Sequence, residues 1–237
     1  MRDRGVTAGM FPNLSQDIER YIHHEGLNES GLLKRIFVLA LNQGLLATMV
    51  HRWGVPVRKI PVSIIRKPLL AIWFIQKKLI EIIFSIHISG AAELGPGFYI
   101  GHFGCFINGR FGKNCSVSQN VTIGSAGRGK KGVPTMGDNV YFGAGSMAFG
   151  AITIGDNVNI GACALVNKNL PSNCTAVGVP ARIISNREAT PKPFQRILFG
   201  AGAAVINAPP SNSIPAGMPA RFSSKEEAVQ TRPRSGL

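Results

Sequence analysis

The stretch MGDNVYFGAGSMAFGAITIGDNVNIGACALV, Met136–Val166, repeats its pattern every six residues. The repeating positions are apolar and comprise Met136, Phe142, Ala148, Ile154, Ile160 and Val166. Glycine follows four of them, and neither the two-residue period of a strand nor the 3.6-residue period of a helix fits the run. A six-residue period is typical of a parallel β-helix, in which each short strand directs one aliphatic side chain inward and three strands close a triangular coil.

The same spacing continues toward the N-terminus, through Leu94, Ile100 and Phe106 and then through Phe111, Val117 and Ile123. Phe106 and Phe111 are five residues apart, so we expect an irregular coil just after His102. Ile123 and Met136 are 13 residues apart because the glycine-rich segment 124–134 is inserted between them. Long insertions are usually functional or disordered, and we expect this one to leave the β-helix as a loop carrying Arg128, Lys130 and Lys131.

We divide the chain into three zones: a helical region over 1–85, the β-helix over 86–184 and a tail over 185–237. Asn13 and Gln16 form a capping-box pattern that predicts a helix start. A second helix is predicted over Leu32–Val50 and another from about Pro68 to Phe84, with prolines interrupting the segment between them. The tail is rich in Pro, Ala, Gly and Ser and is predicted to be disordered, although its apolar piece 194–206 is able to dock on the body.

The chain is strongly basic, with a net charge of +14 over 237 residues. The excess is spread over the three zones as +6, +4 and +4, whereas nucleic-acid binding favours a concentrated patch. A diffuse excess fits an anionic membrane or a phosphorylated cofactor better, so we expect no nucleic-acid partner. The N-terminus lacks an apolar signal region, and the four cysteines form no CxxC pair. We therefore expect reduced thiols and a cytoplasmic location, with the inner face of the membrane as an open alternative.

The segment 60–89 is apolar but is interrupted by Lys77, Lys78 and Glu81. A spanning helix needs about 20 mostly apolar residues with few charges, so this segment reads as an amphipathic helix instead. Two partners for its apolar side stay open: the protein's own domain or trimer, and a membrane surface as a peripheral contact.

His102 is the candidate catalytic residue, in the stretch GFYIGHFGCFINGR, Gly97–Arg110. It lies two positions after Ile100, away from the inward position that a core histidine would take, and glycines at 101 and 104 keep the site open. An imidazole with a pKa near 6.5 suits a general base that activates a hydroxyl. His87 is the other histidine of the repeat region, and two histidines without matched Asp or Cys spacing predict no metal site.

The hexads, the loop after NVTIG and the closing VGVPARII (Val177–Ile184) resemble the hexapeptide-repeat acyltransferases, in the serine O-acetyltransferase branch. The resemblance covers 86–184 closely and the helical region loosely. It implies a left-handed parallel β-helix, a homotrimer with active sites between subunits, acetyl-CoA as co-substrate and His102 as the catalytic histidine. The coenzyme A contacts that it implies fall on Gly143, Ala144, Gly145, Gly161, Ala162, Lys168 and Arg182, with Arg128 and Lys130 of the loop nearby.

The sequence departs from this branch at three places. Gly101 stands where the family has Asp before the histidine, Gly132-Val133-Pro134 replaces an Arg-His-Pro run, and His87 occupies the position of the Asp that pairs with the catalytic histidine. We hypothesise that His87 orients His102 in place of that Asp. The acceptor stays open between L-serine and a sugar hydroxyl in surface-polysaccharide assembly. The other function classes are a non-catalytic trimeric scaffold and a basic nucleic-acid binder.

Overall fold

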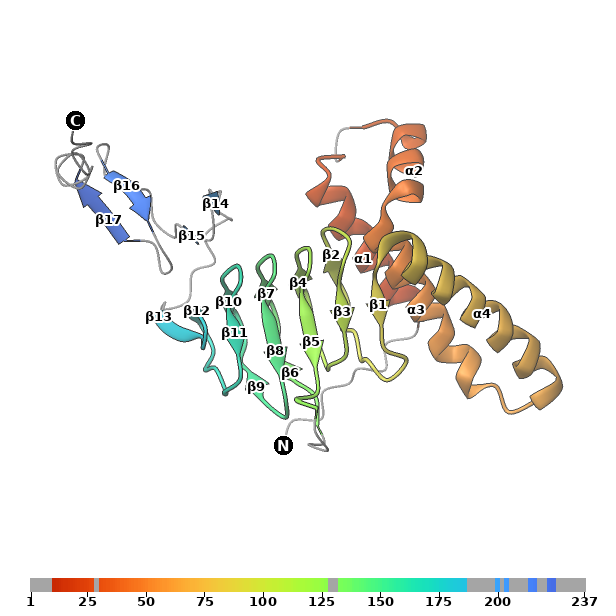
Figure 1. Ribbon diagram of the computed structural model, residues 1–237. Coiled ribbons are helices and arrows are strands. Elements are labelled where there is room, and N and C mark those ends of the chain that lie inside the picture. The colour runs from red at the N-terminus through yellow and green to blue at the C-terminus, as the bar shows by residue number, and fades with distance from the viewer. Residues whose placement is uncertain are drawn as a thin grey trace, which may run out of the picture. The chain divides into compact units, whose positions relative to one another are not determined.

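A computed structural model describes residues 10–27, 30–127 and 132–186, together with four short strands between 199 and 224. The chain divides into two units, 1–188 and 189–237. Within the described residues, the first unit comprises four helices followed by a parallel β solenoid of about five coils (Figure 1). This confirms the predicted β-helix with a helical region before it.

The β-helix has three faces, which we number in chain order. The first face is the sheet of β1 (His87–Ile88), β3 (Phe106–Ile107), β5 (Thr122–Gly124), β8 (Met147–Phe149) and β11 (Leu165–Val166). The second face contains β6 (Thr135–Met136) and β9 (Thr153–Ile154), extended by isolated bridges such as that between Glu93 and Arg110. The third face contains β2 (Tyr99–Ile100), β4 (Ser116–Val117), β7 (Tyr141–Phe142), β10 (Asn159–Ile160) and β12 (Cys174–Val177).

One aliphatic or aromatic side chain from each strand position fills the interior, as the six-residue period predicts. On the first face these residues are Ile88, Ile107, Ile123, Ala148 and Val166, and on the third face they are Ile100, Val117, Phe142, Ile160 and Ala176. Removing these side chains from water supplies most of the stabilisation of the solenoid. Each coil contacts only its neighbours, so this stabilisation builds up coil by coil.

One predicted inward position was wrong. Phe106 points outward and is 42% exposed, whereas Ile107 is fully buried and pairs with Ile123. The shift arises because the corner after Ile100, which contains His102, holds one residue more than the equivalent corners of later coils. The next corner is shorter, so Phe111 returns to the interior.

Glycine and asparagine shape the corners in different ways. A Cβ at Gly143 would lie 2.6 Å from the backbone nitrogen of Ala162 in the next coil, so coil stacking itself requires glycine there. The left-handed backbone conformation is taken instead by residues such as Asn139, Asn157 and Asn173, because asparagine tolerates positive φ better than other side chains do. Their side chains form a ladder, with the Nδ2 of each of the first two donating to the Oδ1 of the next at 2.9 Å.

The helices differ from the sequence prediction in their ends. They are α1 (Met10–His24), α2 (Leu32–Leu41), α3 (Gln43–Lys59) and α4 (Ser63–Phe84). Asn13 lies inside α1 and is buried, so it does not cap the helix as predicted. The single helix predicted over Leu32–Val50 is two helices, because Asn42 adopts an extended conformation and its side chain accepts a hydrogen bond from the backbone nitrogen of Leu45.

Two prolines that were expected to interrupt the chain lie inside helices, Pro56 in α3 and Pro68 in α4. Helix α4 therefore begins at Ser63, a turn and a half before the predicted start. Both prolines are exposed, so each ring stands on a surface of its helix that no other element covers. Pro68 is only the sixth residue of α4, close to the end where a helix tolerates proline.

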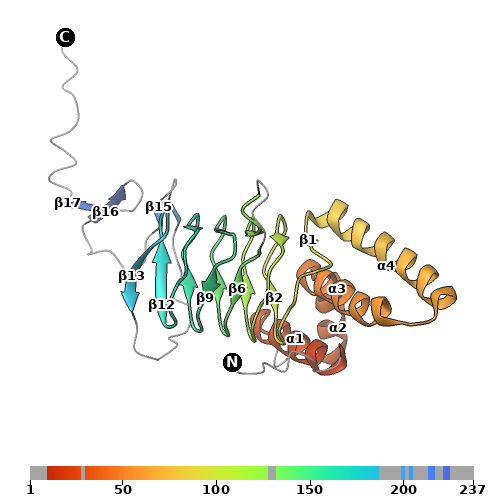
Figure 2. The ribbon, with the colours of Figure 1, turned by 90° about the horizontal axis from the view of Figure 1, so that it is seen from below.

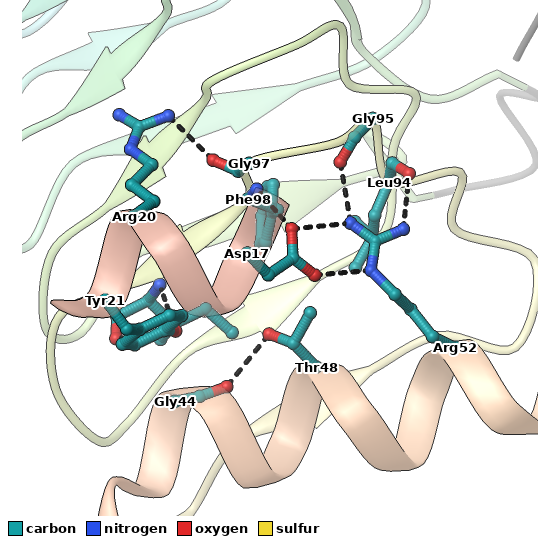
Figure 3. A network of polar contacts seen from close by, with 11 residues as sticks. Asp17, Arg20, Tyr21, Gly44, Thr48, Arg52, Leu94, Gly95, Gly97 and Phe98 are labelled. Atoms are coloured by element: carbon teal, nitrogen blue, oxygen red, sulfur yellow. Dashed lines mark hydrogen bonds and ion pairs between the residues drawn. The ribbon is translucent and has the colours of Figure 1, made fainter. Parts of the chain in front are cut away.

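A buried ion pair joins the helices to the first coil of the β-helix (Figure 3). Both carboxylate oxygens of Asp17 in α1 accept from Arg52 in α3, at 2.5 and 2.9 Å, and Asp17 also accepts from the backbone nitrogen of Phe98 at 2.9 Å. Arg52 donates further to the carbonyls of Leu94 at 3.1 Å and Gly95 at 2.8 Å. The first coil has no preceding coil to pair with, and these side chains satisfy part of its exposed backbone.

Other side chains of α1 and α3 complete this cap. The Tyr21 hydroxyl accepts from the nitrogen of Ile100 at 2.8 Å and donates to its carbonyl at 3.3 Å. Arg20 donates to the carbonyl of Gly97 at 2.7 Å, and the His51 Nε2 lies 3.1 Å from the carbonyl of Ala92. The helical region thus ends the solenoid at its first coil.

The C-terminal part of the chain begins with β13 (Arg182–Asn186), which pairs antiparallel with β12. In the second unit, β14 (Phe199–Gly200) pairs with β15 (Ala203–Ala204), and β16 (Ser213–Ala216) pairs with β17 (Arg221–Ser224). The rest of the tail, including most of the apolar piece 194–206, lies outside the described residues, so its disorder stays a prediction.

Candidate functional site

His102 and the predicted coenzyme A glycines lie along one edge of the β-helix, where the third face turns into the first. We call it the histidine edge and define it as His102, Gly143–Gly145 and Gly161–Ala162, with Arg182 beyond the last coil. The backbone nitrogen of Gly143 donates to the carbonyl of Ile160, and that of Gly161 donates to the carbonyl of Ala176, at 2.8 and 2.9 Å. The nitrogen of Gly101 begins the same row by donating to Val117 at 2.8 Å.

The histidine edge is long enough for an extended ligand. His102 belongs to the first coil, Gly143 to the third and Gly161 to the fourth, and Arg182 pairs with Val177 just after the fifth. Neighbouring strands lie about 4.8 Å apart, and five such spacings separate the strand before His102 from the strand that begins with Arg182, so the edge spans about 24 Å. The side chains of His102 and Arg182 are both exposed at its two ends.

Lys168 lies on a different edge, between the first and second faces. It stands between the inward residues Val166 and Leu170. The inserted loop leaves the β-helix at this same edge, where the nitrogen of Gly150 donates to the carbonyl of Gly124 at 3.0 Å. Arg128, Lys130 and Lys131 lie outside the described residues. We call this the lysine edge, and a single chain does not bring it together with the histidine edge, since the first face separates them.

The corner that carries His102 is built to project its side chain. Gly104 takes a positive φ of 79°, and its nitrogen donates to the carbonyl of Phe84 at the end of α4. The extra residue in this corner lifts His102 out of the regular coil. Within residues 10–27, 30–127 and 132–186, no hydrogen bond or ion pair engages the His102 imidazole. Both ring nitrogens are thus available to a substrate.

His87 contacts Glu81 rather than His102. Its Nδ1 lies 3.0 Å from a Glu81 carboxylate oxygen, and its ring stacks on Phe106 with centroids 4.8 Å apart. Glu81 also accepts from Lys78 at 2.9 Å, and the hydrogen bonds from Lys78 and His87 lower the pKa of its carboxyl. The hypothesis that His87 orients His102 stays a prediction, and Glu81 is the group that holds His87 in place.

Several polar groups near the edge were missed by the sequence analysis. Tyr99 stacks on His24 with centroids 4.2 Å apart, and Ser118 and Tyr141 share a hydrogen bond of 2.8 Å between their hydroxyl groups. Burial raises the pKa of both tyrosines, while burial and then the nearby charge of Arg20 lower the pKa of His24. Tyr99 and Tyr141 stand directly before inward residues and are visible in the hexads, but nothing in the sequence links Tyr99 to α1 or Tyr141 to Ser118.

Among the residues that the structure describes, the cysteines and acidic side chains form no second centre. In the described part of the chain, no three His, Cys, Asp or Glu side chains lie close enough to hold a metal ion. Cys105, Cys115 and Cys174 are buried thiols, and burial raises the pKa of Cys115 to about 12. These thiols act as small apolar core residues.

Comparisons with known proteins place the chain among serine acetyltransferases. It matches no family model. It is 32% identical to the serine acetyltransferase of Synechococcus elongatus over 180 residues, which are 74% of this chain and 69% of that protein. It is 34% identical to the serine acetyltransferase of Helicobacter pylori over 152 residues, 62% of this chain and 85% of that protein.

Solved structures agree. The crystal structure of the Neisseria gonorrhoeae serine acetyltransferase superposes with a TM-score of 0.64 at 25% identity, covering 77% of this chain and 69% of that one. The Brucella abortus serine acetyltransferase in complex with coenzyme A superposes with a TM-score of 0.61 at 26% identity, covering 75% and 68%.

Proposed function

This chain belongs to the serine acetyltransferase family, and we propose that it transfers the acetyl group of acetyl-CoA to the hydroxyl of L-serine. The observation that carries the proposal is the histidine edge, on which an exposed histidine and an exposed arginine stand at opposite ends of a row of glycine corners. Related structures include complexes with coenzyme A and with serine.

In the proposed reaction, His102 acts as the general base. A hydroxyl is a weak nucleophile at neutral pH, so the imidazole accepts its proton as the oxygen attacks the thioester carbonyl. The tetrahedral intermediate then collapses, the carbon–sulfur bond breaks, and the imidazolium returns the proton to the departing thiolate. The unengaged ring nitrogens of His102 suit both proton transfers.

The residues of the histidine edge fit acetyl-CoA as an extended substrate. The thioester lies at the His102 end, and the phosphates lie toward Arg182, whose guanidinium forms charge-assisted hydrogen bonds with them. Gly143 and Gly161 have no side chains to obstruct a ligand, and Gly145 takes a positive φ of 67° that glycine adopts without strain. Coil stacking also requires small residues here, so packing and binding place the same demand on these positions.

We further propose that the enzyme is a homotrimer whose sites form between subunits. The first face, which separates the two edges in one chain, presents exposed apolar side chains, including Phe106 and Met147 at about two-fifths exposure. Phe103, 56% exposed, flanks His102 itself. Burying this face against a neighbour would bring the lysine edge of one subunit to the histidine edge of the next. In that arrangement, Lys168 and the cations of the loop would contact the phosphates of the coenzyme A that is bound at the neighbour's histidine edge.

A thiol-release assay with acetyl-CoA and a panel of acceptors tests the proposed reaction. We expect coenzyme A release that depends on L-serine, with O-acetylserine as the product. Release with sugar hydroxyls but not with serine would instead assign the enzyme to polysaccharide acetylation. If no acceptor leads to coenzyme A release, the result would contradict an enzymatic role and favour a scaffold, whether or not the protein binds acetyl-CoA.

A further inference from the structure

Helix α4 exposes a long row of apolar side chains to solvent. Over its whole described length, 63–84, it has no fully buried residue. The side of α4 that faces α3 and the first coil is half-buried and carries Lys77 and Glu81 together with apolar residues, namely Leu69, Leu70, Trp73, Ile80 and Phe84. The opposite side, which we call the outer face of α4, is exposed and comprises Ile64, Ile65, Ile72, Phe74, Ile75, Leu79, Ile82 and Ile83.

A helix that packs only on its own domain exposes polar side chains on its other side, whereas α4 is apolar on both its half-buried and its exposed side. Ile64 is 86% exposed and Ile82 is 76% exposed, although both belong to the least water-soluble residue type. A contiguous apolar surface of this kind marks a contact with a partner or a membrane.

The same region carries an unbalanced positive charge. Between Glu29 and Glu81 the sequence has nine Lys and Arg residues and no Asp or Glu. Four of them bracket the apolar turn between α3 and α4, as Arg58-Lys59 before it and Arg66-Lys67 after it. We call residues 58–67 the hairpin tip, and both ribbon views show the turn between α3 and α4 projecting away from the later coils of the β-helix (Figures 1 and 2).

The cations of the hairpin tip have no acidic partners in the described part of the chain. Arg58 donates to the carbonyls of Gly54 and Gly90, and Arg66 donates to the carbonyl of Ile60 and the hydroxyl of Ser63. These bonds orient the guanidinium groups without neutralising them. Lys59 and Lys67 extend into solvent beside them.

We propose that the outer face of α4 and the hairpin tip bind the surface of an anionic lipid bilayer. The isoleucines enter the boundary between headgroups and acyl chains while the flanking Lys and Arg side chains contact anionic headgroups. The helix lies on the membrane: among the described helices none is by itself long and apolar enough to span one. The bent pair α2 and α3 reaches that length only in combination, at an angle of 76°, and α3 contributes much of its surface to the protein interior.

Charge complementarity favours a bilayer over the other partners. A second copy of this chain, docked through the same face, would bring the same uncompensated cations together in a two-fold contact. A nucleic acid would satisfy the cations and leave the isoleucines in water. An anionic bilayer satisfies both, and the proposal is independent of the acetyl-transfer reaction.

Vesicle co-sedimentation tests the proposal with the full chain. We expect binding to vesicles of phosphatidylcholine and phosphatidylglycerol at about 0.1 M salt, and loss of binding when salt rises to about 0.5 M. Vesicles of phosphatidylcholine alone should bind far less protein. Equal binding to both vesicle types, or no binding to the anionic ones at the lower salt, would overturn the proposal.

Two variants separate the charged and apolar contributions. Lys59→Gln with Lys67→Gln should weaken binding about 25-fold, at about fivefold for each charge removed near the surface. Lys113→Gln, an exposed lysine on the β-helix, is the matched control and should leave binding unchanged. Ile64→Gln with Ile75→Gln should weaken binding at least about tenfold at unchanged net charge.

Both double variants change exposed positions, and an unaltered unfolding transition verifies that they fold. An affinity of the lysine variant no weaker than that of the control would contradict the proposal. Sedimentation of the isoleucine variant tests whether a second copy of the chain covers the outer face of α4. If this variant has a lower particle mass than the parent and neither protein binds vesicles, the outer face of α4 is a contact between copies and the membrane proposal is overturned.

Discussion

Replacing Asp17 with Asn should destabilise the protein far more than its small change in shape suggests. The carboxylate is fully buried, and its partner Arg52 is only 6% exposed. Asn keeps the volume and still accepts from the nitrogen of Phe98, but it removes the negative charge that compensates the guanidinium. Breaking a buried ion pair by removing one partner costs about 3–5 kcal/mol, because the other charge stays buried without compensation.

Arg52 cannot escape this penalty by moving into solvent. It also donates to the carbonyls of Leu94 and Gly95, so rotating it outward would leave two buried backbone acceptors without donors. For a unit of this size, each kcal/mol lowers the unfolding temperature by about 2–4 °C. We therefore expect the transition of Asp17→Asn to fall by about 6–20 °C.

Urea unfolding of the parent and the variant measures this free energy. Arg110→Gln is the matched control, since its Nε lies 3.3 Å from Glu93 in a pair that is exposed at both side chains. Exposed pairs contribute about 0–1 kcal/mol. A loss for Asp17→Asn that is no larger than the loss for Arg110→Gln would refute the view that this ion pair holds the helical cap to the first coil.

Three further predictions address pH, the corners and the coenzyme. Burial, followed by the charges of Arg58 and Arg52, lowers the pKa of His51 to about 4 from its usual 6.5. Between these two pH values the unfolded chain therefore binds a proton at His51 and the folded chain does not. The free energy of unfolding should fall by about 3 kcal/mol as the pH drops from 6.5 to 4. Unfolding measured across that range should show this component vanish in His51→Gln, and an unchanged profile would count against it. Asn157→Ala should lower the free energy of unfolding in urea by about 2–4 kcal/mol, because alanine strains the left-handed backbone and two hydrogen bonds of the ladder are lost. Asn157→Gly loses the same two hydrogen bonds but relieves the backbone strain, so its loss should be smaller. Equal losses in the two variants would disprove the contribution of the backbone strain. Arg182→Ala should weaken acetyl-CoA binding by about 1.5–3 kcal/mol in calorimetry while the unfolding transition is unchanged, and unaltered affinity would show that the arginine does not meet the coenzyme.

The sequence predicts the β-helix well because its physics is local and periodic. Inward residues such as Ile154 and Ile160 must recur every six positions if each coil is to stack on the next, so the period alone identifies the fold and most of the core. The prediction fails at Phe106, where the corner of His102 holds an extra residue. A spacing rule detects that a coil is irregular there but does not say which corner absorbs the change.

The helical region was less predictable because tertiary contacts override its local signals. Asn13 fits a capping box, yet the helix extends a turn before it and carries Asp17 to the first coil. The partners of Asp17 lie 35 and 81 residues away, and no pattern in the sequence connects them. The apolar character of α4 indicates a helix with a buried side but does not reveal that a second apolar side faces solvent.

The candidate site was predicted residue by residue, but its division between two edges was not. His102 and the glycine corners fall on one edge because each follows an inward residue of the third face, and Arg182 reaches that edge through the antiparallel pairing of β13 with β12. Lys168 belongs to another corner of the coil, and only the folded prism shows that the first face separates the two. The contact of His87 with Glu81 depends on the end of α4, which the repeat pattern does not contain.

Steady-state kinetics of His102→Ala test the central claim that this histidine is the base for acetyl transfer to serine. We expect turnover to fall by about 10²–10⁴-fold while acetyl-CoA affinity and the unfolding transition stay unchanged, because the base meets the acceptor rather than the nucleotide. The pH profile of turnover should differ between the parent and the variant, because the variant has no imidazole to accept the hydroxyl proton. His87→Ala is the companion variant: if His87 positions His102, it should cost less than His102→Ala, and the double variant should be no worse than His102→Ala alone. Turnover of His102→Ala within about tenfold of the parent, with the parent's pH profile retained, would contradict the account.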